Sequence, residues 1–199
     1  MKNKTTTLFS LVSIGMLLIL ACNTSSDNHQ EKTVPEKEST VSIQRGEYLV
    51  NAIGCDDCHS PKRMGAHGPE LIPELRLSGF PEKGQLSETD QKMVQKGWAM
   101  FAPDLTASVG PWGTTYASNI TSDSTGIGSW KEENFLRAIK EGVSKGITGN
   151  RPLLPPMPWA NFRKLTDDDL KSIFAYLQTV KPVHNIVPQS VMAQGPKHG

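Results

Sequence analysis

The chain has 199 residues, and its 21 basic and 20 acidic side chains leave a formal net charge of only +1. No basic stripe stands out along the sequence, so nucleic acid is not an expected partner. The chain contains only three cysteines, Cys22, Cys55 and Cys58, which are too few for a framework of several disulfides.

The first 21 residues have the pattern of a signal peptide. Lys2 and Lys4 form a short basic start, and residues 8–20 form an apolar run too short for a permanent membrane-spanning helix. The run ends in Ala21 and Cys22, which resembles the lipobox of bacterial lipoproteins, in which the cysteine is acylated. The alternative is an ordinary signal peptide that ends near a cysteine. We expect export to the periplasmic or extracytoplasmic side, removal of residues 1–21 and a lipid anchor to the membrane on Cys22.

Residues 22–40 are rich in Ser, Glu, Lys and Asn and have almost no apolar side chains. Such a segment cannot bury enough apolar surface to fold, so we expect a flexible tether. The expected folded domain covers residues 41–188, which is enough chain for one domain. A polar C-terminal tail is expected over residues 189–199.

Residues 41–53 are predicted to form the first helix of this domain. Directly after it, the chain from Cys55 to His59 reads Cys-Asp-Asp-Cys-His. The spacing Cys-x-x-Cys-His is the attachment signature of c-type haem. Residues three apart on a helical turn share one face, so the thiols of Cys55 and Cys58 can both form thioethers with vinyl groups on one haem edge. His59 is then the proximal ligand of the iron, and the single motif predicts one covalent haem c.

Other interpretations of the cysteine pair stay open, including a chance match to a five-residue pattern. Cys55 and Cys58 could form a redox-active disulfide, although the chain lacks the alternating strand and helix pattern that carries such sites. They could also provide half of a zinc site, although the sequence has no second cysteine pair.

Two long stretches rich in Gly and Pro, residues 60–86 and 102–128, are expected to be loops. Loops of this length count against a compact domain unless an apolar body such as a haem lies against them. Between them, residues 87–101 predict a helix with Met93 in its apolar stripe. The predicted fold class is therefore all-α, with long loops that pack against the haem.

Two further helices are expected near the C-terminal end. One begins at Ser129, which opens the capping-box pattern Ser-Trp-Lys-Glu, and buries Phe135 and Ile139 on one face. The other covers residues 166–180, where Thr166 and the acidic residues after it favour a helix start.

The second axial ligand must come from elsewhere in the chain, and Met157 is the strongest candidate. It stands in the run Leu-Pro-Pro-Met-Pro-Trp at residues 154–159. Proline fixes its own φ and drives the preceding residue to extended conformations, so this run predicts a stiff strap that can hold a thioether at a fixed distance. His67 is the main alternative. Met64 and Met100 lie in less constrained surroundings, and Met93 falls on a helical stripe, where methionine usually packs in the core.

Ligation by His59 and Met157 has a consequence for function. A thioether ligand raises the reduction potential relative to two histidines. With both axial positions filled by protein, the iron exchanges electrons readily and does not readily bind a substrate. The sequence therefore predicts a single-electron carrier and not an enzyme. A haem enzyme or gas sensor in which Met157 leaves the iron is the first alternative, and a structural protein with a Cys55–Cys58 disulfide and no cofactor is the second.

From about residue 45 to residue 188 the chain resembles class I cytochrome c, in particular bacterial monohaem domains similar to those in cytochrome subunits of membrane-bound dehydrogenases. The runs that carry the resemblance surround the haem motif and the Met157 strap in order along the chain. They are Arg-Gly-Glu-Tyr-Leu (45–49), Gly-Pro-Glu-Leu (68–71), Asn-Ile-Thr (119–121), Thr-Gly-Ile-Gly-Ser-Trp (125–130), Pro-Met-Pro-Trp (156–159) and the segment 169–177.

The resemblance implies a cytochrome c fold in which Gly46 lets the first helix cross the last one closely, with Tyr176 at the contact. It also implies that the Pro69 carbonyl accepts a hydrogen bond from Nδ1 of His59 and so fixes the ring. The side chain that would reach a haem propionate is one of Trp112, Asn119 and Trp130.

The implied partners are a dehydrogenase or oxidase and other cytochromes. The long span between His59 and Met157 departs from the smallest members of the family and implies an insertion over one haem edge.

Overall fold

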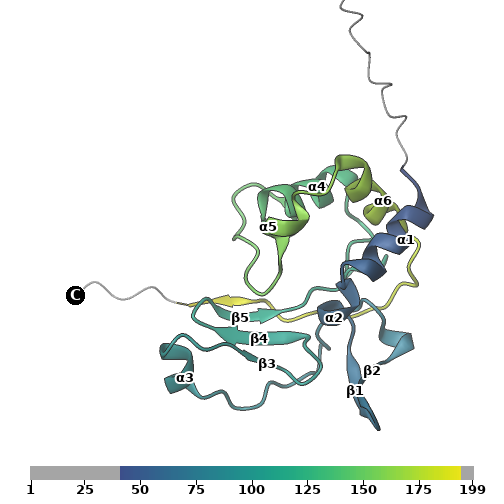
Figure 1. The fold of residues 1–199 in the computed structure, drawn as a ribbon. Helices are drawn as coiled ribbons and strands as arrows, with labels where there is room; N and C mark the ends of the chain where they lie inside the picture. Colours follow the sequence, from purple (N-terminus) through teal and green to yellow (C-terminus); the bar gives the residue numbers. More distant parts are fainter. Residues whose placement is uncertain (1–40, 194–199) are drawn as a thin grey trace, which may run out of the picture. The chain divides into compact units, whose positions relative to one another are not determined.

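The computed structural model describes residues 41–193 (Figure 1). The expected signal peptide, Cys22 and the tether up to residue 40 lie outside the described residues, as do residues 194–199 of the expected tail. Within the described range there are six α-helices, two short 3-10 helices and six β-strands. The predicted all-α class is therefore wrong, because about 33% of the structure is helix and about 14% is antiparallel strand.

Helices α1 (Ile43–Ala52) and α6 (Asp167–Leu177) cross at close range. A Cβ atom on Gly46 would collide with the backbone carbonyl of Ser172 and would lie 2.8 Å from Cβ of Tyr176. The crossing therefore requires glycine at position 46, and the expected contact with Tyr176 is confirmed.

Side-chain caps fix where these two helices begin. The Ser42 hydroxyl accepts a hydrogen bond of 3.0 Å from the backbone N–H of Arg45. The Thr166 hydroxyl accepts one of 3.1 Å from the backbone N–H of Asp169, so the predicted cap of the last helix is confirmed.

Helix α4 (Glu132–Glu141) starts three residues later than predicted. The backbone N–H of Trp130 bonds the Ile127 carbonyl at 3.0 Å, so Ser129 lies in a turn before the helix and does not cap it. Lys131 is the residue at the cap, and its N–H donates to the Asn134 side chain at 3.3 Å. The predicted buried face is confirmed, since Phe135 and Ile139 are buried.

One hydrophobic core joins α1, α4 and α6. Its buried members come from all three helices and from two segments between them; they are Leu49, Val50, Leu77, Ile127, Phe135, Ile139, Leu170, Ile173, Phe174, Tyr176 and Leu177. The short helices α2 (Cys55–His59), α3 (Gln91–Gln95) and α5 (Trp159–Phe162) and the 3-10 turns η1 (Pro73–Leu75) and η2 (Ser144–Gly146) complete the helical elements.

The segments expected to be loops contain strands of two antiparallel sheets. Strands β1 (Lys62–Gly65) and β2 (Gly68–Leu71) form a hairpin in which Lys62 pairs with Leu71. The second sheet has the order β3-β4-β5-β6, from the strands β3 (Met100–Phe101), β4 (Ala107–Gly110), β5 (Gly113–Tyr116) and β6 (Val191–Met192).

One further prediction is corrected by this sheet. Of the helix expected over residues 87–101 only α3 forms, because Gly97 has φ +93° and the chain then continues into β3. Within the range of the expected polar tail, Val191 and Met192 pair with Thr114 and Gly113 of β5.

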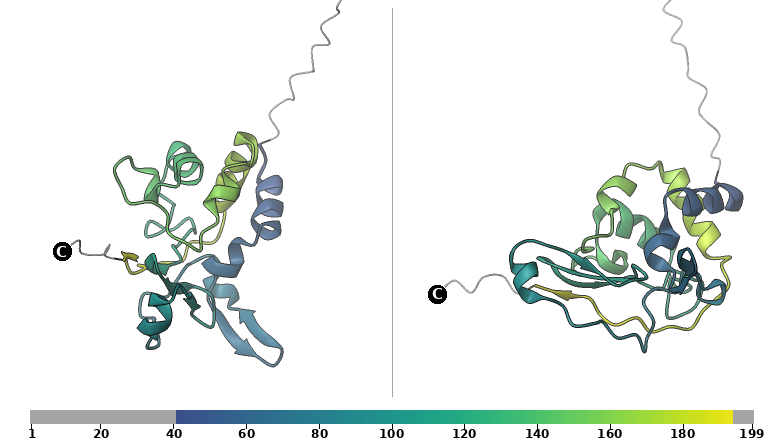
Figure 2. Two further views of the ribbon diagram at one scale, coloured as in Figure 1. Left: turned by 60° about the vertical axis from the view of Figure 1, so that its left-hand side comes forward. Right: turned by 60° about the horizontal axis from the view of Figure 1, so that its bottom comes forward.

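The strands and the longer helices occupy different sides of the described domain, with α2 at the junction between them (Figure 1). The chain after α6 runs back along the domain to the sheet, where it forms β6 (Figure 2). In residues 41–193, no helix has both the length and the apolar character needed to cross a membrane.

Candidate functional site

The Cys-x-x-Cys-His motif forms the short helix α2, as predicted. Gly54 starts it in the left-handed conformation with φ +75°, which lets the chain turn sharply out of α1. Cys55 and Cys58 are both half-buried and are not joined by a disulfide. Residues three apart on one helical turn face the same side, so both thiols are placed to bind one ligand edge.

Burial affects the acidity of both thiols. Burial, followed by the charge of the Asp56 carboxylate, raises the pKa of Cys55 to about 12. Burial also raises the pKa of Cys58, and the ammonium of Lys62 partly opposes this. A raised pKa makes the thiolate, which is the reactive form in disulfide exchange, less abundant at both positions.

The imidazole of His59 is oriented by a backbone carbonyl. Its Nδ1 donates a hydrogen bond of 2.7 Å to the carbonyl oxygen of Ser118. A carbonyl can only accept, so the proton is on Nδ1 and the lone pair of Nε2 is available to a metal. Burial lowers the pKa of His59 despite the opposing effect of the Ser118 bond, which favours the neutral ring that binds iron.

The expected partner of this ring, the Pro69 carbonyl, is therefore corrected to that of Ser118. Pro69 lies in β2 and pairs with Met64 of the β1–β2 hairpin. Sequence reasoning had no signal for Ser118, because a backbone acceptor carries no side-chain signature.

The buried side chain of Asn119 holds the segment that carries the Ser118 carbonyl. Its amide group donates to the Val183 carbonyl at 2.8 Å and to the Thr125 hydroxyl at 3.1 Å. Its oxygen accepts bonds from the backbone N–H and the hydroxyl of Thr121. These contacts give Asn119 a structural role next to the His59 partner, and its amide protons are engaged within the protein.

A second polar network fixes α2 against the helices. The Arg76 guanidinium donates to both carboxylate oxygens of Asp56 at 2.7–3.2 Å and to the Tyr176 hydroxyl at 2.8 Å. The Ser60 hydroxyl also donates to Asp56, at 2.6 Å. This bidentate pair ties the variable position inside the haem motif to α6, and it was not predicted from the sequence.

Met157 lies on the predicted strap, and its half-buried side chain packs against the hydrophobic core that Cys55 also contacts. The strap is attached to the sheet, because the Thr115 hydroxyl of β5 donates to the Pro155 carbonyl at 2.6 Å. The same hydroxyl accepts a bond of 3.1 Å from Nε1 of Trp112. The Trp112 donor is thus used within the protein.

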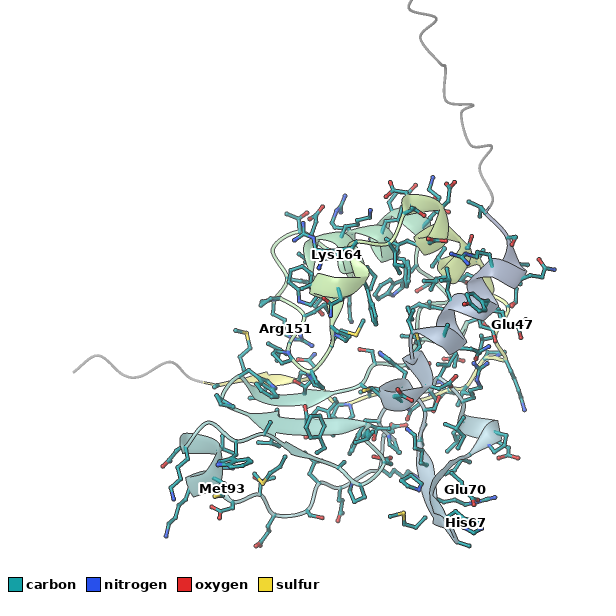
Figure 3. The ribbon with its side chains drawn as sticks, in the orientation of Figure 1. Glu47, His67, Glu70, Met93, Arg151 and Lys164 are labelled. Atoms are coloured by element: carbon teal, nitrogen blue, oxygen red, sulfur yellow. The ribbon has the colours of Figure 1, made fainter. Side chains whose placement is uncertain are left out.

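The other candidate ligands lie on peripheral elements. His67 is exposed at the turn of the β1–β2 hairpin, where Figure 3 shows it beside Glu70 and pointing away from the domain. Met64 of the same hairpin is 72% exposed. Met93 lies on α3, and Met100 lies on the edge strand β3. Of the five candidates only Met157 packs against the hydrophobic core.

The donor set fits a covalently attached haem. It comprises two free thiols on one helical turn, an imidazole whose Nε2 is its only available acceptor, and a thioether that packs on the same hydrophobic core as Cys55. This combination defines the class of c-type haem proteins. Residues 43–181 match the family model described as Cytochrome c, and the chain therefore belongs to the cytochrome c family.

The curated relatives are components of dehydrogenases. The fructose dehydrogenase cytochrome subunit of Gluconobacter japonicus is 29% identical over 183 residues, which are 91% of this chain and 30% of the relative. The cytochrome c subunit of the quinone alcohol dehydrogenase of Gluconacetobacter polyoxogenes is 39% identical over 152 residues, 75% of this chain and 24% of the relative.

The gluconate 2-dehydrogenase cytochrome c subunit of Pantoea cypripedii is 29% identical over 154 residues, 77% of this chain and 25% of the relative. The chain spans less than a third of the length of each of these relatives. It is a c-type cytochrome similar to dehydrogenase cytochrome subunits.

Proposed function

We propose that this chain is a single-electron carrier with one haem c, attached through Cys55 and Cys58 and ligated by His59 and Met157. The observation that carries the proposal is the hydrogen bond of 2.7 Å from Nδ1 of His59 to the Ser118 carbonyl. His59 directly follows Cys58 in α2, the helix that also contains Cys55. When bound, a haem c supplies a couple between ferric and ferrous iron. The family match of residues 43–181 supports the same cofactor.

The protein residues have distinct tasks in this proposal. His59 is held in one orientation, so its Nε2 keeps a fixed position through oxidation and reduction. Met157 is restrained by the prolines on both sides and by the hydrogen bond to Pro155. A thioether ligand raises the reduction potential and occupies the position that a substrate would need. Because His59 and Met157 both stay on the iron, the site transfers electrons and leaves no open position for a substrate.

We infer that the electron donor is a dehydrogenase and that the acceptor is another cytochrome or an oxidase. The similarity to the fructose and alcohol dehydrogenase cytochrome subunits supports a dehydrogenase partner. The signal-peptide pattern and Cys22 support export and a lipid anchor at the extracytoplasmic face of a membrane. Mass spectrometry of the exported protein tests this arrangement, with one haem mass on the peptide of residues 55–59 and acyl chains on Cys22 as the expected result.

Replacement of Met157 tests the ligand assignment. In Met157→Ala the iron loses its thioether, so we expect loss of the low-spin spectrum, a lower reduction potential and rapid binding of carbon monoxide to the reduced protein. Met64→Ala is the matched control, because Met64 is exposed on the hairpin and its removal leaves all three readouts unchanged.

An unchanged spectrum and potential in Met157→Ala would exclude Met157 as a ligand. Rapid, complete binding of carbon monoxide by the unmodified reduced protein would favour the haem enzyme or gas sensor over the carrier. Absence of covalent haem after expression with the maturation machinery would overturn the proposed function altogether.

A further inference from the structure

Lys62, the first residue of β1, has an unusual set of partners. Its half-buried ammonium lies within hydrogen-bond distance of four backbone carbonyl oxygens, at 2.7, 3.0, 3.0 and 3.2 Å. Three of them belong to α2 or to the residue after it: Asp57, Ser60 and Asp56. The fourth is the carbonyl of Asp104, which lies between β3 and β4.

The three carbonyls near α2 need a donor. The last carbonyls of a helix have no partner within it, and α2 has only five residues. The carbonyl of His59 is satisfied by the backbone N–H of Gly79 at 2.7 Å. Lys62 supplies donors for Asp56 and Asp57, so it caps the C-terminal end of the helix that carries the thiols and the proximal histidine. A cation there also complements the negative end of the helix.

The fourth carbonyl connects this cap to the sheet. The Asp104 carboxylate accepts bonds from the backbone N–H of Thr106 at 3.1 Å and from its hydroxyl at 2.8 Å. Thr106 is completely buried, and its carbonyl accepts a bond of 2.8 Å from the N–H of Ala117, next to Ser118. The Asp104 carbonyl therefore belongs to the same framework that orients His59, and Lys62 joins that framework to α2.

The charge of Lys62 acts on the site as well as its hydrogen bonds. The ammonium lies 2.7–3.2 Å from three backbone carbonyl oxygens of α2 and of the residue after it, so its charge is held beside the haem motif. An ammonium that is half-buried among backbone carbonyls is screened less by salt than an exposed one. A positive charge at this place disfavours the oxidised iron, which carries one more positive charge than the reduced iron.

We propose that Lys62 is a positioning residue that locks the haem-attachment helix to the sheet and, through its fixed charge, raises the reduction potential. The proposal rests on the proposed function, because it assumes a haem on Cys55 and Cys58. Lys62 touches neither thiol nor imidazole ring in the hydrogen bonds described, so it acts through the backbone of α2 and through its field.

Three variants separate the two contributions. Lys62→Met removes the charge and the donors, Lys62→Gln keeps a donor without the charge, and Lys62→Arg keeps the charge with altered geometry. Lys92→Gln is the matched control, because Lys92 is exposed on α3 and its loss changes the net charge equally. All proteins are produced with the haem-maturation machinery, their haem content is measured, and the potentials of the haem-loaded fractions are determined by optical redox titration.

We expect the ferric-to-ferrous ratio at a fixed applied potential to rise about tenfold in Lys62→Gln and Lys62→Met, which is a fall of about 59 mV for one electron. Lys62→Arg should stay near the unmodified protein, and Lys92→Gln should equal it. Should the two neutral variants accumulate without haem while Lys62→Arg matures normally, the positioning role is supported.

Equal potentials and equal haem content in all four variants would overturn the inference, as would failure of Lys62→Arg to mature when Lys62→Gln matures normally. Haem in the unmodified protein distinguishes these outcomes from failure of the proposed function, which would leave the unmodified protein without covalent haem.

Discussion

The helical region of this cytochrome, formed by α1, α4 and α6, and its strand region, formed by the sheet β3–β6 and the connections 102–106 and 117–119, are held together in different ways. The helical region is stabilised by close packing of buried Leu, Ile and Phe side chains. Its helices α1 and α6 cross so closely that there is no space for a Cβ at Gly46. The strand region contributes no buried side chain to the main hydrophobic core. It is tied to the site by hydrogen bonds.

Three of those hydrogen bonds reach segments that carry or adjoin candidate ligands. The Ser118 carbonyl accepts from His59, the Asp104 carbonyl accepts from Lys62, and the Thr115 hydroxyl donates to Pro155 beside Met157. The stability of the domain and the geometry of the candidate ligands therefore depend on different regions of this fold. Damage to the helical region should unfold the domain, whereas damage to the strand region should change the iron site with little unfolding.

The largest expected effect breaks the helical region. In Gly46→Ala the new methyl group collides with the Ser172 carbonyl, so α1 and α6 must move apart. We expect overpacking to cost about 3 kcal/mol and the better helix propensity of alanine to return about 1 kcal/mol, a net loss of about 2 kcal/mol. Urea unfolding of the haem-loaded protein measures it. Glu47→Ala, on the exposed face of α1 (Figure 3), is the control, and equal midpoints for the two variants would contradict the packing argument.

A smaller effect on stability, with a larger one on the iron, is expected in the strand region. Thr115→Val keeps the shape of the side chain and removes the hydroxyl that joins Trp112 and Pro155. The loss should be about 1 kcal/mol. Because the strap is then less restrained, the reduced protein should bind carbon monoxide faster and have a lower potential. Thr114→Val, the neighbouring residue of β5, is the control, and identical behaviour of the two variants would show that the strap needs no support from the sheet.

The same division explains what the sequence could predict. The helices α1 and α6 follow from local signals, since Ser42 and Thr166 cap them and apolar residues recur at helical spacing. The start at Ser129 was wrong, because residues 127–130 form a turn and the helix begins after Lys131, whose N–H donates to the Asn134 side chain. Local patterns thus predicted these helices correctly, and the prediction of one boundary, the start of α4, was wrong.

The strands of the strand region were not predicted, for two physical reasons. Its strands have two to four residues, and the turn from β4 to β5 contains Gly110, Pro111 and Gly113, which are typical of loops. In addition, β6 completes the sheet from residues 191–192, a pairing that depends on distant parts of the chain. No local pattern reports such a pairing.

In the candidate site, too, the residues of a local motif were predictable and their distant hydrogen-bond partners were not. Cys55, Cys58 and His59 lie on one helical turn as their spacing requires. The acceptors that fix His59 and Lys62 are backbone carbonyls, which every residue has, so their positions become known only with the fold.

The smallest expected effect tests whether charge contributes to the helical region. The Lys140 ammonium lies 2.6 Å from the Asp167 carboxylate at the start of α6, and this hydrogen bond lowers the pKa of Asp167 below its ordinary value of 3.8. A lowered pKa means that the folded protein binds the proton less readily than the unfolded chain. The stabilisation is therefore fully present above the ordinary pKa and is lost as the pH falls through the lowered one.

Asp167→Asn should thus give a small decrease in the urea midpoint near neutral pH and none in strong acid, where both states are protonated. Glu133→Gln, an exposed carboxylate in the first turn of α4, is the control for the change in net charge. The Asp167 side chain is 67% exposed, so solvent and salt screen the pair, and added salt should reduce the difference further. A decrease comparable to that of Gly46→Ala, or one that persists in strong acid, would show that the helical region depends on more than the shape of its packing.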